Sequence, residues 1–144
     1  MTAWILTGVP GTGKGLFVHK ILKPLFGDAQ VPMRSLENIE EQFNLYMRTA
    51  MFLVVDEFRM ADSGSVGKMA DKLKHQITEP TLTIRAMRTN QIELPSFTNF
   101  IFLTNRADAV KIEESDRRYN VAPRQEVKLE IANKEVIELS LIHI

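Results

Sequence analysis

The sequence predicts an α/β fold in which a central, mostly parallel sheet carries an inserted β-hairpin. Short apolar runs at residues 3–7, 51–55 and 99–103 have the length and composition of strands buried on both faces. The first run leads through a glycine-rich turn into an amphipathic helix, which is the order of elements found in parallel sheets. Between the second and third runs the apolar period changes to two, as it does in a hairpin.

Three helices are expected between these strands. The first covers residues 14–22 and stops near Pro24, the second begins at a Ser35 cap, and the third follows a flexible loop at residues 63–67. Each has apolar residues at helical spacing. These are Phe17, Val18, Ile21 and Leu22 in the first, Leu36, Ile39, Phe43 and Met47 in the second, and Val66, Met69, Leu73 and Ile77 in the third.

The hairpin is expected to run from residue 81 to 87, turn at residues 88–90 and return over 91–94. Residues 119–121 predict a fourth strand of the main sheet. We therefore divide the chain into one core domain, residues 1–123, and a C-terminal tail, residues 124–144. The tail ends in LSLIHI, which resembles translated adapter sequence, so it is expected to be truncated or non-native.

Composition excludes several classes of protein. The chain has 144 residues, of which 44% are apolar and 25% charged, as in a globular domain of ordinary size. It contains no cysteine and no apolar run long enough to span a bilayer, so we expect a cytoplasmic protein with no membrane partner. The formal charge is zero, but residues 58–91 carry six bases and three acids, which would suit an anionic partner.

The glycine-rich turn matches the phosphate-binding pattern GxxxxGK and lies where a P-loop NTPase needs it, between a buried strand and a helix. Its glycines allow backbone N–H groups to point at a phosphate, and Lys14 adds a positive charge for the β and γ oxygens. Gly15 replaces the usual Ser or Thr that binds Mg²⁺, so the metal would depend on water, phosphate and Asp56. The predicted nucleotide-binding residues are Gly8, Val9, Pro10, Gly11, Thr12, Gly13, Lys14, Gly15 and Leu16.

Two carboxylates follow the second buried strand directly. Because ligands collect at the carboxyl ends of parallel strands, Asp56 and Glu57 are expected at the same edge as the phosphate loop. Asp56 can hold Mg²⁺ through its water shell, and Glu57 can polarise the water that attacks the γ-phosphate. Without the upstream loop such a pair is more often a solvated turn, so the interpretation depends on both motifs.

Two later motifs add further polar groups. Asn105 ends the third buried strand, where its amide could bind the γ-phosphate and the attacking water. Arg117 and Arg118 precede the predicted fourth strand, and guanidinium groups suit phosphate oxygens that gain charge during transfer. A surface ion pair between Asp116 and one of the arginines is the alternative explanation.

In this order the motifs become recognisable as a set: GVPGTGKG at residues 8–15, FLVVDE at 52–57, FIFLTN at 100–105 and DRRY at 116–119. The set resembles the ATPase core of viral superfamily III helicases, especially phage helicase modules joined to primases. QFN at residues 42–44 also looks like that group, and the resemblance covers roughly residues 3–121.

This resemblance implies a three-layer, AAA+-like P-loop NTPase that works as a ring, typically a hexamer, with ATP and Mg²⁺ bound between subunits. Lys14 would then contact the phosphates, Asp56 would hold Mg²⁺ and Glu57 would activate water. Asn105 would sense the γ-phosphate, and Arg117 or Arg118 would reach the neighbour's ATP as an arginine finger. The expected function is that of an ATP-hydrolysing DNA helicase core from a phage or mobile element.

The family also carries a basic hairpin before the Asn-bearing strand, which follows single-stranded DNA through the ring. By this likeness, Arg85 and Arg88 are the expected DNA-binding residues of the hairpin, with Lys72 and Lys74 as nearby candidates. Such bases would follow the phosphates without reading sequence. Because the chain begins directly at the first core strand, it looks like part of a larger protein, and an associated or fused primase is an expected partner.

Two other functions stay open at this point. The Lys14-Gly15 pair also occurs in the loops of nucleoside monophosphate kinases, although the acidic strand end and Asn105 favour the ATPase. Gly15 also leaves room for a module that binds nucleotide for assembly without hydrolysing it. Transfer of phosphate from ATP to AMP would identify the kinase, and bound but intact ATP would identify the assembly module.

Overall fold

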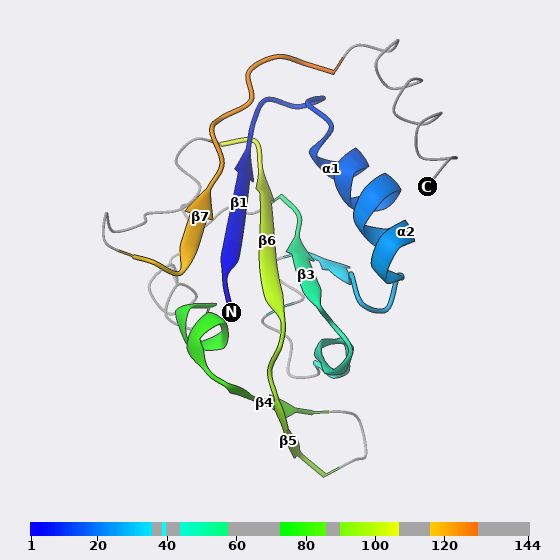
Figure 1. Ribbon diagram of the computed structural model, residues 1–144, viewed down its shortest axis with the longest axis vertical. Coiled ribbons are helices and arrows are strands. Elements are labelled where there is room, and N and C mark those ends of the chain that lie inside the picture. Colours follow the sequence, from blue (N-terminus) through cyan, green and yellow to red (C-terminus); the bar gives the residue numbers. More distant parts are fainter. Residues whose placement is uncertain (36–38, 40–43, 58–72, 86–89, 107–115, 130–144) are drawn as a thin grey trace.

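The computed structural model describes residues 1–35, 39, 44–57, 73–85, 90–106 and 116–129. Within these residues five strands form one parallel sheet in the order β2-β3-β6-β1-β7, and two further strands form a separate antiparallel pair (Figure 1). The sheet strands are β1 (Ala3–Thr7), β2 (Met33–Arg34), β3 (Phe52–Val55), β6 (Asn99–Thr104) and β7 (Tyr119–Val121). The predicted α/β fold with a parallel central sheet is thus confirmed, as are the four strands expected in it.

The strand order puts β6 at the centre of the sheet. β6 pairs with the whole length of β1, from Ala3 beside Phe100 to Thr7 beside Thr104, and with β3 on its other side. Because all five strands are parallel, the segments that follow β1, β3, β6 and β7 leave from the same edge of the sheet. β2 has only two residues and was not predicted, since so short a pairing leaves no periodic signal in the sequence.

Alternate residues of the strands pack into two apolar clusters, one on each face of the sheet. The first cluster includes Phe100 and Phe102 of β6, both fully buried, whose rings stack with centroids 6.1 Å apart. The second cluster contains the intervening β6 residues Ile101 and Leu103. Burial on both faces explains why these strands read as continuous apolar runs in the sequence.

A continuous helical segment covers the second cluster. It consists of α1 (Lys14–Phe17), a π-helical turn η1 (Val18–Leu22) and α2 (Lys23–Phe26), and its Val18 and Leu22 contribute buried side chains. The prediction that the helix stops near Pro24 was therefore wrong, because Pro24 lies in the first turn of α2. A proline lacks an N–H and crowds the preceding turn, and the wider π turn before it provides the local change of geometry that such a residue needs.

The predicted hairpin is present as β4 (Thr81–Ile84) and β5 (Ile92–Pro95), which pair in antiparallel fashion. Residues 73–78, just before it, are helical, and their Leu73 and Ile77 are buried in the first cluster together with Ile84 of β4. In Figure 1 the hairpin lies at the end of the sheet opposite to the predicted phosphate loop between β1 and α1.

The second and third predicted helices fall mostly outside the described residues. Of the second, the described part includes the buried Ile39 and the short 3-10 helix η2 (Leu45–Arg48), in which Met47 is buried. Of the third, only residues 73–78 are described.

Candidate functional site

The predicted phosphate loop joins β1 to α1 at the carboxyl edge of the sheet (Figure 1). Gly11 and Gly13 have φ values of 89° and 88°, a region that residues with a side chain rarely adopt. Gly8 is required for a different reason, because a Cβ on it would lie 2.8 Å from the carbonyl oxygen of Gln125. Three of the loop's glycines are thus explained by backbone geometry alone.

Lys14 is folded over its own loop. Its Nζ donates hydrogen bonds to the carbonyl oxygens of Gly8 at 2.9 Å and Val9 at 3.1 Å, and to Thr12 Oγ1 at 3.1 Å. Partial burial lowers the pKa of Lys14, and the nearby positive charge of Arg124 lowers it further, while Asp56 acts in the opposite direction. The ammonium group is therefore held at the loop, next to both a carboxylate and a second cation.

The strand order brings three predicted site residues to one pocket. β1 leads to Lys14, β6 ends next to Asn105 and β3 ends next to Asp56, and β6 lies between the other two. Asn105 and Asp56 line a pocket of about 400 Å³ together with the loop residues from Pro10 to Leu16. Residues separated by more than forty positions in the sequence thus share one cavity because their strands are parallel.

The two acids after β3 differ in their backbone. The Asp56 N–H donates to the Arg34 carbonyl of β2 at 3.1 Å, so Asp56 still continues the sheet pairing. Glu57 has a φ of 51°, the one positive value among the described non-glycine residues, and its N–H donates to Asp56 Oδ1 at 2.9 Å. Such a conformation costs about 1 kcal/mol and is found most often where function needs it. Both side chains are exposed.

Arg124 is a site residue that the sequence reasoning missed. Its two terminal nitrogens each donate to the Asn105 carbonyl oxygen at 3.2 Å, and its charge lowers the pKa of Lys14, after the larger effect of burial. It follows the end of β7, so the rule that placed Asp56 and Asn105 at this edge applies to it equally. No signal in the sequence marked it, because a single arginine three residues after a three-residue strand belongs to no motif.

The segment that carries Arg124 continues along the phosphate loop. The Gln125 N–H donates to the Thr7 carbonyl at 3.0 Å, the Val9 N–H donates to the Gln125 carbonyl at 2.9 Å, and the Leu129 N–H donates to the Gly11 carbonyl at 2.9 Å. These contacts join residues 124–129, which the sequence analysis assigned to a tail, to the core domain.

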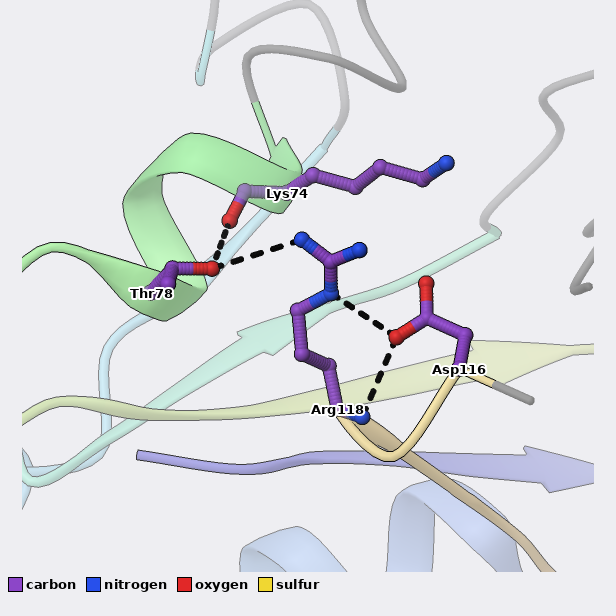
Figure 2. Close-up of polar contacts among 4 residues, drawn as sticks. All are labelled: Lys74, Thr78, Asp116 and Arg118. Atoms are coloured by element: carbon purple, nitrogen blue, oxygen red, sulfur yellow. Dashed lines mark hydrogen bonds and ion pairs between the residues drawn. The ribbon is translucent and has the colours of Figure 1, made fainter.

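Arg117 and Arg118 lie at the opposite edge of the sheet, because they precede β7 instead of following it. Arg118 is engaged within the chain: its Nε donates to Asp116 Oδ1 at 2.8 Å and its Nη1 to Thr78 Oγ1 at 3.5 Å (Figure 2). The side-chain hydrogen bond from Arg118 is the main reason that the pKa of Asp116 is lowered. Arg117 is exposed, and among the described residues no hydrogen bond or ion pair engages it.

The ion pair of Arg118 with Asp116 was the alternative explanation for the DRRY motif, and it holds for one arginine of the two. Only 4% of the Asp116 side chain is exposed. The Thr78 hydroxyl, which accepts from Arg118, donates in turn to the Lys74 carbonyl at 2.6 Å (Figure 2). Arg118 thereby links the loop before β7 to the helical residues 73–78.

The predicted DNA-binding residues are described in part. Arg85 directly follows β4 and is exposed, and Lys74 lies in the helical residues 73–78 and is partly exposed. Arg88 and Lys72 lie outside the described residues. Arg85 and Lys74 belong to elements at the end of the sheet away from the phosphate loop.

Neither a metal-binding cluster nor a membrane-spanning helix is found in the described ranges of the chain. No group of three or more His, Asp or Glu side chains that could hold a metal by itself occurs there. In the same ranges no helix has both the length and the apolar composition needed to cross a membrane.

Comparison with known proteins gives relatives for most of the chain. A curated DNA primase-polymerase of the Nitratiruptor phage NrS-1 is 36% identical over 119 residues, which are 83% of this chain and 16% of that protein. A solved apo structure of the NrS-1 C-terminal region matches with a TM-score of 0.80 and 31% identity, and a second form matches with a TM-score of 0.76 and 29% identity. Each match covers 97% of this chain, and 35% and 33% of the solved chains respectively.

The chain thus spans a small part of these longer relatives. A family pattern matches residues 6–118, from the end of β1 to the Asp116–Arg118 contact, and therefore includes every described residue of the 400 Å³ pocket. On this match, the chain belongs to the family of unknown function DUF5906.

Proposed function

We propose that this chain is the ATP-hydrolysing core of a phage DNA replication protein that moves along single-stranded DNA. The observation that carries the proposal is the shared pocket of Lys14, Asp56 and Asn105, three groups delivered by three different strand ends. The similarity to a phage DNA primase-polymerase supports a role in phage replication. Because this chain spans 16% of that protein, a primase, fused or associated, is proposed as a partner and not as an activity of this chain.

The residues of the pocket fit a triphosphate. The loop offers backbone N–H groups, and Lys14 can exchange its present carbonyl and hydroxyl acceptors for the more strongly charged β and γ oxygens. An adjoining pocket of about 340 Å³, with Leu6, Phe17, Ala122 and Pro123 in its walls, suits the planar base. Arg124 adds a second positive charge from the same chain.

For hydrolysis, a water must be held in line with the bond that breaks. Glu57 takes a proton from that water as its oxygen attacks the γ-phosphorus, and the bond from the γ-phosphorus to the ADP oxygen breaks. The Asn105 amide orients the water and the γ-phosphate. The positive φ of Glu57, directly after Asp56, supports a functional role, since such backbone conformations cluster at active sites.

Mg²⁺ fits the donor chemistry of this pocket. Asp56 supplies an oxygen ligand of the kind that Mg²⁺ prefers, and the remaining ligands would be phosphate oxygens and water, as is usual for this ion. When bound, Mg²⁺ would neutralise charge on the β and γ phosphates. Gly15 contributes no side-chain ligand, and a Cβ placed on it would meet no atom within 4 Å.

In the proposed ring of subunits, a hexamer, each subunit would reach its neighbour's ATP from the edge of its sheet opposite to its own pocket. Arg118 is already paired with Asp116, whereas Arg117 is exposed and lies away from its own pocket. We therefore assign the arginine finger to Arg117, acting on the ATP of a neighbouring subunit, and a supporting role in the same chain to Arg118. On the same end of the sheet, Arg85 and Lys74 would contact the DNA backbone. Arg88 and Lys72, which lie outside the described residues, are proposed for the same role from the sequence.

The proposal is tested by measuring ATP hydrolysis over a range of protein concentrations, with and without a poly-dT oligonucleotide. We expect hydrolysis that DNA stimulates and that rises per subunit with concentration, because a neighbour completes the site. Lys14→Ala and Glu57→Gln should each lower the rate at least about 100-fold. Lys23→Ala is the matched control, since Lys23 pairs with Asp28 at 3.1 Å outside the pocket.

Two results would contradict the proposal. ATP that binds but stays intact with and without DNA would favour the nucleotide-dependent assembly module. Phosphate transfer to AMP would favour the kinase.

A further inference from the structure

Asn44 attaches the base of the β4–β5 hairpin to the core. Its Nδ2 donates to the Thr83 carbonyl at 2.9 Å, and its Oδ1 accepts from the Arg85 N–H at 2.8 Å. Its own N–H donates to the Arg85 carbonyl at 3.2 Å. Thr83 and Arg85 are two positions apart on an extended segment, so the groups that Asn44 binds face one edge of that segment. Asn44 therefore pairs with β4 much as a neighbouring strand would.

The side chain of Asn44 forgoes its usual local partner to make these contacts. Asn44 is the N-cap residue of η2, a position where Asn commonly accepts a hydrogen bond from the first turn. Here the side chain makes no capping hydrogen bond. The amide is committed to residues some forty positions further along the chain, which indicates a role in holding the hairpin and not the 3-10 helix.

A short series of contacts leads from Asn44 to the nucleotide pocket. Tyr46, two residues after Asn44, lies under the guanidinium of Arg34, whose carbon is 4.8 Å from the ring centroid. Arg34 belongs to β2, and its carbonyl accepts the hydrogen bond from the N–H of Asp56. The backbone of a pocket residue and the backbone of an exposed hairpin arginine are thus connected through one 3-10 helix.

We propose that Asn44 is a positioning residue that couples the nucleotide pocket to the hairpin, by fixing the backbone at Arg85 relative to the strand end that bears Asp56. This inference rests on the proposed function and adds the regulation of the same site. Coupling between two sites is reciprocal in free energy. Nucleotide at the loop should therefore alter the hairpin, and an anionic strand on the hairpin should alter nucleotide binding.

Loss of the Asn44 amide should leave the hairpin attached. Ile84 of β4 is 3% exposed and packs in the first cluster with Met47 of η2, so apolar contacts still hold the two elements together. What changes is the angle and order of the hairpin base. Asn44→Ala is therefore a change in coupling rather than a loss of fold, and thermal unfolding will check this.

The test compares the full chain with Asn44→Ala, Tyr46→Leu and Thr49→Val. Thr49→Val is the matched control, because Thr49 is the C-cap residue that follows the same 3-10 helix and its hydroxyl donates to the Ala29 carbonyl at 3.2 Å, away from the hairpin. Amide hydrogen exchange is measured at β4 and β5 with and without Mg·ATP, and ATP hydrolysis is measured with and without poly-dT.

In the unchanged chain and in Thr49→Val, nucleotide should alter exchange at both the loop and the hairpin. In Asn44→Ala and Tyr46→Leu it should alter exchange at the loop alone. Stimulation by poly-dT should fall about 5-fold or more in these two variants, while hydrolysis without DNA stays within about twofold.

The possible failures can be told apart. If Asn44→Ala keeps both the exchange change at the hairpin and the stimulation by DNA, the inference is overturned while the proposed function stands. The same holds if the unchanged chain hydrolyses ATP but shows no exchange change at the hairpin. If nucleotide changes exchange neither at the loop nor elsewhere, the proposed function fails and the inference fails with it.

Discussion

The two ends of the parallel sheet use their polar and charged residues differently. At the carboxyl edge, Asp56 and Asn105 are exposed and face a pocket beside Lys14. At the amino edge, Arg118 and the buried carboxylate of Asp116 are bound to each other and to the helical residues 73–78. Charges that face a pocket can serve a ligand, whereas charges that face each other serve the fold. Changes at the carboxyl edge should therefore affect activity, and changes at the amino edge should affect stability.

Arg117 should be the exception to this division between activity and stability, and its substitution should have the largest effect on activity. It lies at the amino edge but is exposed, so Arg117→Ala should leave thermal unfolding unchanged and lower ATP turnover about 1,000-fold, as expected for an arginine finger. Mixing Arg117→Ala with Lys14→Ala subunits should restore part of the activity, because each supplies what the other lacks. Full activity in Arg117→Ala together with loss in Arg118→Ala would reverse the assignment.

Substitution of Arg118 should lower the stability of the fold and leave ATP hydrolysis nearly unchanged, as the division predicts for the amino edge. Arg118→Ala removes the side-chain donor of the buried Asp116 carboxylate and leaves it the hydrogen bond from the backbone N–H of residue 118, at 3.1 Å. We expect a loss of about 1–2 kcal/mol in the free energy of unfolding, measured by urea denaturation. Hydrolysis per folded subunit should change little, and a fall as large as that in Arg117→Ala would contradict the division.

The same ion pair should appear in the pH dependence of stability. Hydrogen bonds from Arg118 lower the pKa of Asp116 below its usual value. The ion pair therefore stabilises the fold at every pH above the usual pKa of an aspartate. This contribution is lost as the pH falls below about 4, through the lowered pKa. Urea denaturation between neutral and acidic pH should therefore show a steeper loss of stability in the unchanged chain than in Asp116→Asn. Equal slopes would mean that the pair contributes nothing.

Arg124 tests the prediction that residues at the carboxyl edge serve a ligand. Its guanidinium rests on the Asn105 carbonyl, and in the proposed complex it turns to the phosphates. Arg124→Gln should weaken nucleotide binding about tenfold, since a hydrogen bond with a charged partner contributes about 1.5 kcal/mol or more. Isothermal titration with ADP and ATP will measure this, and Arg48→Gln, an exposed residue of η2, is the control. Unchanged affinity would leave Arg124 with a structural role only.

Gly15 should give the smallest effect. A Cβ at this position meets open space, and glycine within a helix costs up to about 1 kcal/mol relative to alanine, so Gly15→Ala should raise the unfolding midpoint slightly. Gly15→Ser should in addition lower the Mg²⁺ concentration needed for half-maximal hydrolysis, because it supplies a hydroxyl. A loss of stability in both variants would show that the space is needed.

What the sequence could predict depended on how local each signal is. The predicted phosphate loop is contiguous with the strand before it and the helix after it. The glycine pattern and the apolar runs were therefore sufficient to predict the positions of β1 and of the loop Gly8–Leu16. Asp56 and Asn105 required only the further rule that parallel strands end at one edge. Arg124 fell under the same rule, but a single arginine after a three-residue strand has no pattern around it.

The remaining features are non-local. The contacts of Asn44 with Thr83 and Arg85 depend on where two distant segments meet, and no periodicity records that. The difference between Arg117 and Arg118 depends on which side chain reaches Asp116, and adjacent identical residues cannot be separated by spacing. The path through Pro24 depends on a π turn, which has no sequence signature of its own.

The pairing of Gly8 with Gln125 decides where this chain can be cut. A shortened version that stops at residue 123, the domain boundary expected from the sequence, would lack the carbonyl that binds the Val9 N–H and the backbone that binds Thr7 and Gly11. The predicted phosphate loop would then lack these backbone contacts before any ligand binds. Expression designs, fusions and affinity tags should therefore leave everything through Leu129 in place.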